Sequence, residues 1–267
     1  MDIALICSLK DPASVNMNHG FAFFEETRER FQGCLVYQYR LSPHMLRLYT
    51  VEDELLSMAV FPKADLLIFL SKHRSKENTP NFTIHAPGNW GKAEFGGQEG
   101  KLCPTSAFSL KSLFIGMSKT AGLPVTLEPT HHGPYTEIPS IFVEIGSTER
   151  EWSNKEYGAQ IAESILNTLK NPAKKYKPAL LLGGLHYNDA ANKIQKNSGL
   201  AIGHICPKYS LPYVSKALLS QAIEKTTEGI DVILVDWKGM GEEKQRILNL
   251  LDTMSLPYER MQRIALE

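Results

Sequence analysis

Short apolar runs alternate with helical segments along much of this chain, and this alternation constrains its fold more than any other feature of the sequence. From residue 106 the alternation is regular. Residues 106–120 place apolar side chains at helical spacing, residues 140–145 form a strand-like run, and residues 154–170 return to helical spacing. Strands that alternate with helices favour a sheet covered on both faces. The sequence therefore predicts an α/β fold.

The remaining elements follow from the same patterns. Ser215 is the expected N-cap of one helix, and Gly122 is the expected stop of another. Residues 31–60 are the least regular part, and we expect a small irregular or β insertion there, within a single domain spanning 1–267. We predict further strands at 3–7, 35–41, 46–51, 65–70, 125–128, 178–182, 200–205 and 230–235, and further helices within 12–30, 215–227 and 242–254.

Composition excludes several classes of protein. The chain has 267 residues, 43% of them apolar, which is enough for one large core. Its 29 basic and 29 acidic residues cancel, so a nucleic acid would have to bind at a local basic patch. No run approaches the roughly 20 apolar residues of a membrane span, and the four cysteines form no Cys-x-x-Cys pair. We expect a cytoplasmic monomer that binds neither membranes nor DNA.

Six of the eight histidines lie in short motifs that follow or overlap a strand-like run. In an open α/β sheet, the loops at the carboxyl ends of strands converge on one crevice. Imidazole exchanges protons near neutral pH and is the commonest metal ligand in proteins. The sequence therefore predicts one active site built from these loops. The six residues are His73, His85, His131, His132, His186 and His204.

Two of these motifs carry the sharpest local signals. His131 and His132 precede Gly133-Pro134, which forces a turn, so both rings can face the crevice. The alternative is one exposed histidine and one that caps the core. Glu144 is the lone carboxylate in the apolar run 141–145, and a buried carboxylate needs a partner. It is a candidate base or metal ligand, and the alternative is an edge-strand glutamate that faces solvent.

The other motifs are less specific. Trp90 lies in a loop rich in glycine and proline, where it either stacks on a base or ribose or fills the core. Gly183 and Gly184 follow a strand, so their N–H groups either bind an oxyanion or simply shape the turn. His204 taken alone is as typical of a core histidine as of a ligand.

Charged residues near these motifs suggest contacts with a substrate. Asp236 and Lys238 follow the strand at 230–235, where they would orient a histidine and meet a phosphate, or simply pair with each other. Lys72 and Lys92 would add a local positive rim for an RNA backbone. Zinc accepts histidine and carboxylate ligands, but the chain has no His-Glu-x-x-His motif. A zinc site would have to be assembled from separate loops.

Together, the motifs resemble the archaeal and plant type of D-aminoacyl-tRNA deacylase. The resemblance covers roughly residues 65 to 255 in order, and it is weakest at residues 21–60, to which we assign no role. It rests on Ser71-Lys-His73, Thr-Ile-His-Ala-Pro-Gly-Asn-Trp-Gly at 83–91, Thr-His-His-Gly-Pro at 130–134, Pro-Ser-Ile-Phe-Val-Glu-Ile-Gly-Ser at 139–147, Gly-Gly-Leu-His-Tyr at 183–187, Gly-His-Ile-Cys-Pro-Lys-Tyr at 203–209 and Val-Asp-Trp-Lys-Gly at 235–239.

The resemblance implies cleavage of the ester that joins a D-amino acid to the 3′ end of tRNA. It also implies zinc dependence and a phosphorylase/hydrolase-like fold, a three-layer α/β/α sandwich with a mostly parallel mixed sheet. On this basis we assign catalytic roles to His85, His132, Glu144 and His186, and zinc binding to His73, His131 and His204. The expected substrate-binding residues are Asn89, Trp90, Lys92, Gly183, Gly184, Tyr187, Lys208, Asp236 and Lys238.

Two other functions stay open at this point. A zinc-dependent amidohydrolase or peptidase on a related fold would cleave small amides without tRNA. A tRNA-binding module without chemistry would have no need for six clustered histidines, and its charge would be more basic than 29 against 29.

Overall fold

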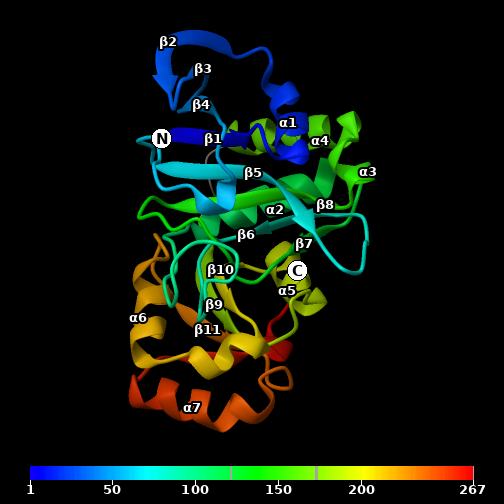
Figure 1. Cartoon of the computed structure of the whole chain (residues 1–267). Coiled ribbons are helices and arrows are strands. Elements are labelled where there is room, and N and C mark those ends of the chain that lie inside the picture. Colours follow the sequence, from blue (N-terminus) through cyan, green and yellow to red (C-terminus); the bar gives the residue numbers. More distant parts are fainter. Residues whose placement is uncertain (121, 172–173, 267) are drawn as a thin grey trace.

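The structure is a computed structural model that describes residues 1–120, 122–171 and 174–266. Twelve strands in this part of the chain form two sheets, one above the other in Figure 1. The first sheet has eight strands in the order β2-β3-β4-β1-β5-β8-β6-β7. Its strands are β1 (Asp2–Ser8), β2 (Glu25–Phe31), β3 (Cys34–Leu41), β4 (His44–Val51), β5 (Leu66–Arg74), β6 (Asn81–His85), β7 (Val125–Leu127) and β8 (Ser140–Ser147).

The second sheet has four strands in the order β10-β9-β11-β12, and all of its pairings are parallel. In the first sheet, β1 pairs in parallel with β4 and β5, as do β5 with β8 and β6 with β7. The expected α/β fold with mostly parallel strands is therefore confirmed, although the strands form two sheets where one was expected. The second sheet contains β9 (Lys177–Leu182), β10 (Leu200–Cys206), β11 (Val232–Val235) and β12 (Tyr258–Arg260).

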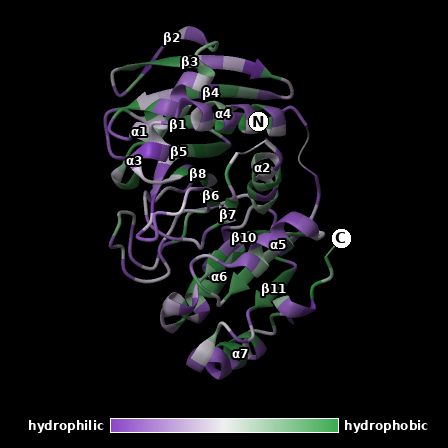
Figure 2. Cartoon of the chain, turned by 90° about the vertical axis from the view of Figure 1, so that its right-hand side faces the viewer, coloured by the Kyte–Doolittle hydropathy of each residue, from purple (hydrophilic) through white to green (hydrophobic). Residues whose placement is uncertain are grey.

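The largest core joins the two sheets. Leu5 and Ile68 of the first sheet, Phe114 and Ile161 of the helices and Leu181 of the second sheet are all buried in it. Figure 2 shows this apolar interior in green along the central strands. The helices are α1 (Pro12–Asn18), α2 (Ala107–Thr120), α3 (Glu149–Trp152), α4 (Lys155–Leu169), α5 (Asp189–Asn197), α6 (Lys216–Glu224) and α7 (Lys244–Thr253).

The opposite faces of the two sheets are covered differently. On the second sheet, Leu219 of α6 and Ile247 of α7 pack against Leu180 and Ile233, so helices cover both of its faces as in the expected three-layer arrangement. On the first sheet, Leu55 and Met58 and the segment around them pack against the strands.

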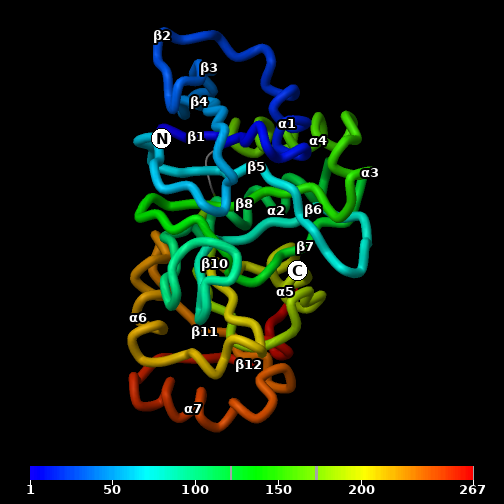
Figure 3. Tube along the Cα trace, viewed as in Figure 1, coloured from blue at the N-terminus to red at the C-terminus, as the bar shows by residue number. Residues whose placement is uncertain are grey.

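The N-terminal region differs in part from the prediction. The helix expected within 12–30 is shorter than predicted. It begins at Pro12 with Asp11 as its cap and ends at Asn18. Residues 25–31 form β2 instead. The strands expected at 35–41 and 46–51 are present as β3 and β4. Because β4 pairs with β1, the hairpin extends the first sheet, as the blue end of the trace in Figure 3 shows.

Two elements give a loop a defined shape near the site described below. Asn188 caps α5 by accepting hydrogen bonds from the backbone N–H groups of Ala190 and Ala191. Ser215 caps α6 as the sequence predicts.

Within residues 1–120, 122–171 and 174–266, no helix has both the length and the apolar character that a membrane crossing requires.

Candidate active site

Strand register brings the first group of polar side chains together. On β8, Glu144 lies opposite Ser71 of β5 on one side and Thr83 of β6 on the other. Residues two apart on a strand share a face, so His73 and His85 lie on the same face of the sheet as Glu144. The Thr83 hydroxyl donates to Glu144 Oε2 over 3.0 Å. This explains why one buried carboxylate sits between two histidines.

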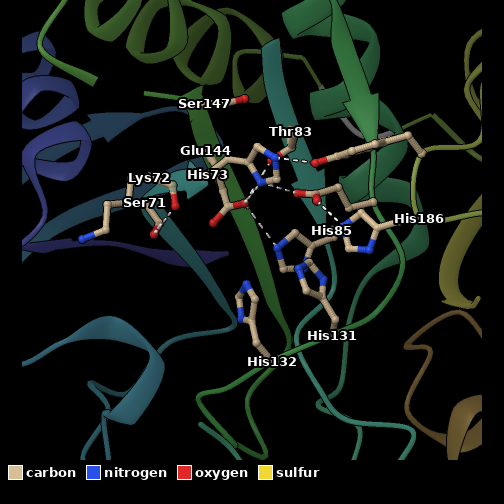
Figure 4. Close-up of polar contacts among 12 residues, drawn as sticks. Ser71, Lys72, His73, Thr83, His85, His131, His132, Glu144, Ser147 and His186 are labelled. Carbon is tan, nitrogen blue, oxygen red and sulfur yellow. Dashed lines mark hydrogen bonds and ion pairs between the residues drawn. The ribbon is translucent and has the colours of Figure 1, made fainter. Parts of the chain in front are cut away.

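Loops from both sheets complete the cluster. Glu128, His131 and His132 follow β7 of the first sheet, and His186 follows β9 of the second. The ring centroids of His131 and His186 are 5.0 Å apart, and those of His85 and His131 are 4.3 Å apart. Figure 4 shows the three rings converging below His73 and Glu144. Five of the six selected histidines therefore meet in one place.

Three histidines present one nitrogen each to a common point. The Nδ1 atoms of His85, His131 and His132 contact the carbonyl oxygens of Ala86, Pro129 and Gly133 at 3.1, 2.8 and 2.7 Å. A carbonyl only accepts, so each Nδ1 carries the proton and each Nε2 keeps a lone pair. His85, His131 and His132 can each offer one ring nitrogen to a metal ion, and these three nitrogens lie within 4.8 Å of one another. The buried Nε2 of His85 has no hydrogen bond among the described residues, but it lies 3.6 Å from Glu144 Oε2. Burial opposes protonation of His85, yet Glu144 outweighs that effect and raises its pKa.

A second set of contacts links two carboxylates and two histidines. Glu128 Oε1 lies 2.7 Å from His186 Nε2, and Glu128 Oε2 lies 3.2 Å from His73 Nδ1. The same His73 nitrogen is 3.6 Å from Glu144 Oε2, and His73 Nε2 contacts the Tyr187 hydroxyl at 2.7 Å. His186 Nδ1 is 3.0 Å from the hydroxyl of Tyr209. Both nitrogens of His73 are therefore engaged, which does not favour the zinc-binding role expected for it.

The charges in this network stabilise one another. Burial opposes protonation of His73, but Glu128 and Glu144 outweigh that effect and raise its pKa to about 11. Burial would raise the pKa of Glu144, whereas hydrogen bonds to His73 and His85 lower it to about 2. The pKa of Glu128 lies well below its usual value for the same kind of reason, because His186 and His73 offset its burial. Near neutral pH, a cationic His73 thus lies between two anionic carboxylates.

The neighbouring histidines are shifted in the other direction. Burial and the nearby His85 lower the pKa of His132 to about 4. Burial, His132 and His85 lower the pKa of His131 well below its usual value. Both rings are therefore neutral near pH 7, and a neutral imidazole is the form that binds a metal ion.

Glu128 is the residue that the sequence interpretation missed. It was placed at the end of a strand and given no role, yet its side chain is 1% exposed and contacts two histidines. The signal was present, because a carboxylate directly follows the apolar β7 and precedes Pro129 and the two histidines. A single glutamate at the end of a predicted strand is a weaker signal than the two adjacent histidines that follow Pro129.

Trp90 and Asn89, two of the expected substrate contacts, are buried in the structure. Trp90 is 2% exposed, and its indole N–H donates to the carbonyl of Ile205 over 2.9 Å, so it fills the core. The Asn89 amide donates to the carbonyl oxygens of Gly96 and Gln98 and closes its own loop.

The N–H groups of Gly183 and Gly184, which were expected to bind an oxyanion, already have partners in the structure. Their N–H groups donate to the carbonyl oxygens of Cys206 and Gly239 at 2.8 and 3.2 Å. Both glycines have positive φ values, of 96° and 93°, which a residue with a side chain rarely adopts. Their function is to turn the chain so that His186 reaches the cluster.

The remaining selected residues lie around the cluster or apart from it. His204 is fully buried, its Nδ1 lies 3.1 Å from the Thr130 hydroxyl, and it joins none of the ligand groups found in the described chain, so the expectation that it binds zinc has no support. Asp236 accepts hydrogen bonds from Gly239 N–H and the Gln262 amide. Lys92, Lys208 and Lys238 are exposed.

Comparison with known proteins identifies the family. A family model of D-aminoacyl-tRNA deacylases matches residues 60–259. The chain belongs to the D-aminoacyl-tRNA deacylase family. A D-aminoacyl-tRNA deacylase of Thermococcus kodakarensis is 40% identical over 203 residues, which are 74% of each chain. A deacylase of Pyrococcus furiosus is 35% identical over 263 residues, which are 93% of this chain and 96% of the relative.

The deacylase fold of this chain also matches a crystal structure, that of a conserved protein of unknown function. The two are 26% identical, and the match covers 98% of this chain and 96% of the other with a TM-score of 0.84. The shared fold therefore takes in the hairpin of β3 and β4, which lies outside the residues that the deacylase family model matches.

Proposed function

We propose that this protein hydrolyses the ester bond between a D-amino acid and the 3′ end of tRNA, releasing the free D-amino acid and the tRNA. The observation that carries the proposal is the Glu128–His186 pair beside His85, His131 and His132, in a chain that belongs to the deacylase family. A carboxylate, a histidine and a cluster of further imidazoles supply what ester hydrolysis by water requires.

His186 is the proposed general base. Glu128 accepts the Nε2–H of His186, so Nδ1 is the basic nitrogen, and it faces the half-exposed side of the cluster beside Tyr209. His186 Nδ1 removes a proton from a water molecule as the water oxygen bonds to the ester carbonyl carbon. The bond from that carbon to the ribose oxygen then breaks. The same nitrogen returns the proton to the ribose oxygen, which leaves as a hydroxyl.

His73 is the proposed positioning residue for this base. Its positive charge between Glu128 and Glu144 keeps Glu128 ionised, and an ionised Glu128 holds His186 in the correct tautomer. The Tyr187 hydroxyl and the β5–β8 pairing fix the position of His73 in turn. In this proposal His73 does not touch the substrate. It acts on the base through Glu128, and the negative charge of Glu144 helps to keep His73 protonated.

Zinc is the proposed cofactor, with the Nε2 atoms of His85, His131 and His132 as its ligands. The fit rests on the backbone carbonyls that hold all three Nδ1 atoms, as is usual for histidines bound to a metal, and on the buried Nε2 of His85, which makes no hydrogen bond among the described residues. When bound, zinc would supply positive charge to the developing oxyanion. The occupied N–H groups of Gly183 and Gly184 do not provide that charge.

Two exposed aromatic rings are the proposed seat of the terminal adenosine, in place of Trp90. Tyr209 is 58% exposed, and its ring is nearly parallel to that of His186. Phe95 is 67% exposed, and its carbonyl accepts the N–H of Gly133, next to His132. Rings that are already held in place stack on a base at little entropic cost.

The direct test compares D-tyrosyl-tRNA with L-tyrosyl-tRNA as substrates of the purified protein supplied with zinc. We expect rapid hydrolysis of the D-ester and slow hydrolysis of the L-ester. His186→Ala should reduce the rate about 10²–10⁴-fold, which is the usual contribution of general-base catalysis. His19→Ala is the matched control, because His19 is exposed, directly follows α1 and belongs to none of the histidine groups found in the described chain.

Two outcomes would overturn the proposal. Hydrolysis of small amides at rates that tRNA does not affect would favour the amidohydrolase or peptidase. Tight binding of tRNA by a well-folded preparation that hydrolyses neither ester would favour the binding module.

A further inference from the structure

A second polar pocket lies at the edge of the second sheet, away from the histidines. It has a volume of about 320 Å³ and is lined by Trp237, Tyr258, Glu259, Arg260 and Arg263. We call this set of residues the Trp237 pocket. The mechanism proposed above uses none of these residues. Two of the predicted substrate contacts, Asp236 and Lys238, flank Trp237 in the sequence.

The pocket combines aromatic surface with available positive charge. The guanidinium carbon of Arg260 lies 3.5 Å from the centre of the Trp237 ring, and Lys244 Nζ lies 5.0 Å from it. In the described part of the chain, no ion pair engages Arg260 or Arg263. The only carboxylate in the lining, Glu259, is 3.9 Å from Lys177. The guanidinium groups are therefore free to bind an anion.

Sheet topology places this pocket on the same edge as the active site. The strands β9, β10, β11 and β12 are parallel, so their carboxyl ends lie at one edge. His186 follows β9, Trp237 follows β11, and Arg263 follows β12. In the sheet order, β12 is two strands from β9, which corresponds to about 10 Å at the usual strand spacing.

Exposed side chains bridge the two places. Lys208 and Tyr209 follow β10, and Lys238 follows Trp237, and all three are exposed. The Gln262 amide donates to Asp236 Oδ1 over 2.9 Å, so this carboxylate beside Trp237 in the sequence has a hydrogen-bond partner of its own. Positively charged and aromatic side chains thus follow β10 and β11, two of the strands whose carboxyl ends share an edge with the histidine of β9 and the Trp237 pocket.

We propose that the Trp237 pocket binds a phosphodiester group and an adjoining base of the substrate tRNA, outside the aminoacylated end. This inference rests on the proposed function, because it assigns a further contact to the same substrate. Arginine binds phosphate with two parallel hydrogen bonds, and its plane also stacks on bases. A chain with equal numbers of acidic and basic residues needs such a local patch to hold RNA.

The experiment measures binding of uncharged tRNA to the whole protein at several salt concentrations. Uncharged tRNA keeps the result independent of hydrolysis, so a failure of the proposed function would not obscure it. The test variant is Arg260→Ala with Arg263→Ala. The control variant is Arg28→Ala with Arg40→Ala, which removes the same charge from exposed positions on β2 and β3 at the far end of the molecule (Figure 1).

We expect the test variant to bind tRNA about 10–100-fold more weakly, because each good contact with phosphate or base contributes a few kilocalories at most. The slope of log affinity against log salt should become shallower by about 0.7–0.9, for the one phosphate that is no longer neutralised. The control should match the wild type in both. Because Arg263 is exposed, Arg263→Glu provides a second test that does not disturb the stack on Trp237.

Three results would overturn the inference. They are wild-type affinity and slope in the test variant, equal weakening in the control variant, and weaker binding of inorganic phosphate alone with unchanged binding of tRNA. The last result would assign the pocket to a free anion.

Discussion

At the residue scale, the account depends on Glu128, a carboxylate with 1% exposure that joins His186 to His73. Glu128→Gln keeps the size of the side chain but removes the charge that fixes the tautomer of His186. We expect kcat for D-aminoacyl-tRNA to fall about 10²–10⁴-fold with little change in KM. Glu163→Gln, at an exposed position of α4, is the matched control in steady-state assays. A Glu128→Gln variant with wild-type kcat would remove Glu128 from the mechanism.

Trp90 gives a second prediction at this scale. Trp90→Phe keeps most of the ring but loses the hydrogen bond to the Ile205 carbonyl. The variant should be less stable by about 0.5–1.5 kcal/mol in denaturant unfolding, because one buried hydrogen bond is lost while the Ile205 carbonyl still accepts the N–H of Thr130. Its KM should equal that of the wild type, whereas Phe95→Ala should raise KM. An increase in KM for Trp90→Phe would show that Trp90 contributes to substrate binding although its side chain is buried.

His204 makes the stability of the protein depend on pH. Burial lowers its pKa to about 4, so the folded protein keeps this ring neutral while the unfolded chain protonates it below about pH 6.5. The unfolded state then binds more protons, and stability falls as the pH drops from about 6.5 to 4, by about 3 kcal/mol for this residue. Unfolding by urea across that range, with a chelator present, should give a flatter profile for His204→Gln. An unchanged profile would contradict the buried neutral state.

At the scale of elements, the turn from β9 to α5 positions His186. A Cβ at Gly184 would lie 2.2 Å from Asn188 Nδ2, the side chain that caps α5. Gly184→Ala should therefore move the turn and reduce kcat at least about 10-fold, a loss typical of a misplaced catalytic group. Gly229→Ala is the control, because φ is positive there too but a Cβ meets nothing within 4 Å. Its cost should be confined to about 1–2 kcal/mol of stability. Equal kcat in both variants would show that the turn does not position the base.

Local sequence patterns predict most elements but not their pairing. The apolar periodicity of α4 and the run that forms β8 are visible in the sequence, and so is the cap Ser215. The contact of Glu128 with His73 joins the segment after β7 to strand β5, so it depends on the β6–β7, β6–β8 and β5–β8 pairings, which no local pattern encodes. The split into two sheets was missed for the same reason.

At the scale of the whole molecule, binding of zinc should stabilise the fold. Histidines from β6 and from the segment after β7 supply the proposed ligands, so the complete set exists only in the folded state. Zinc at 100 times its Kd should raise the free energy of unfolding by about 2.7 kcal/mol, and a chelator should reverse the rise in Tm. His131→Ala should abolish this increase, and His204→Ala should retain it. The opposite pattern would place the metal at His204.

The central claim is that rings carried by two different sheets form one catalytic unit. Its most direct test is the rate of D-tyrosyl-tRNA hydrolysis by His85→Ala of the first sheet, His186→Ala of the second, and the double variant. Groups that act as a unit lose activity together, so the double variant should be about as slow as the slower single variant. Losses that multiply in the double variant, or a wild-type rate in either single variant, would contradict the claim.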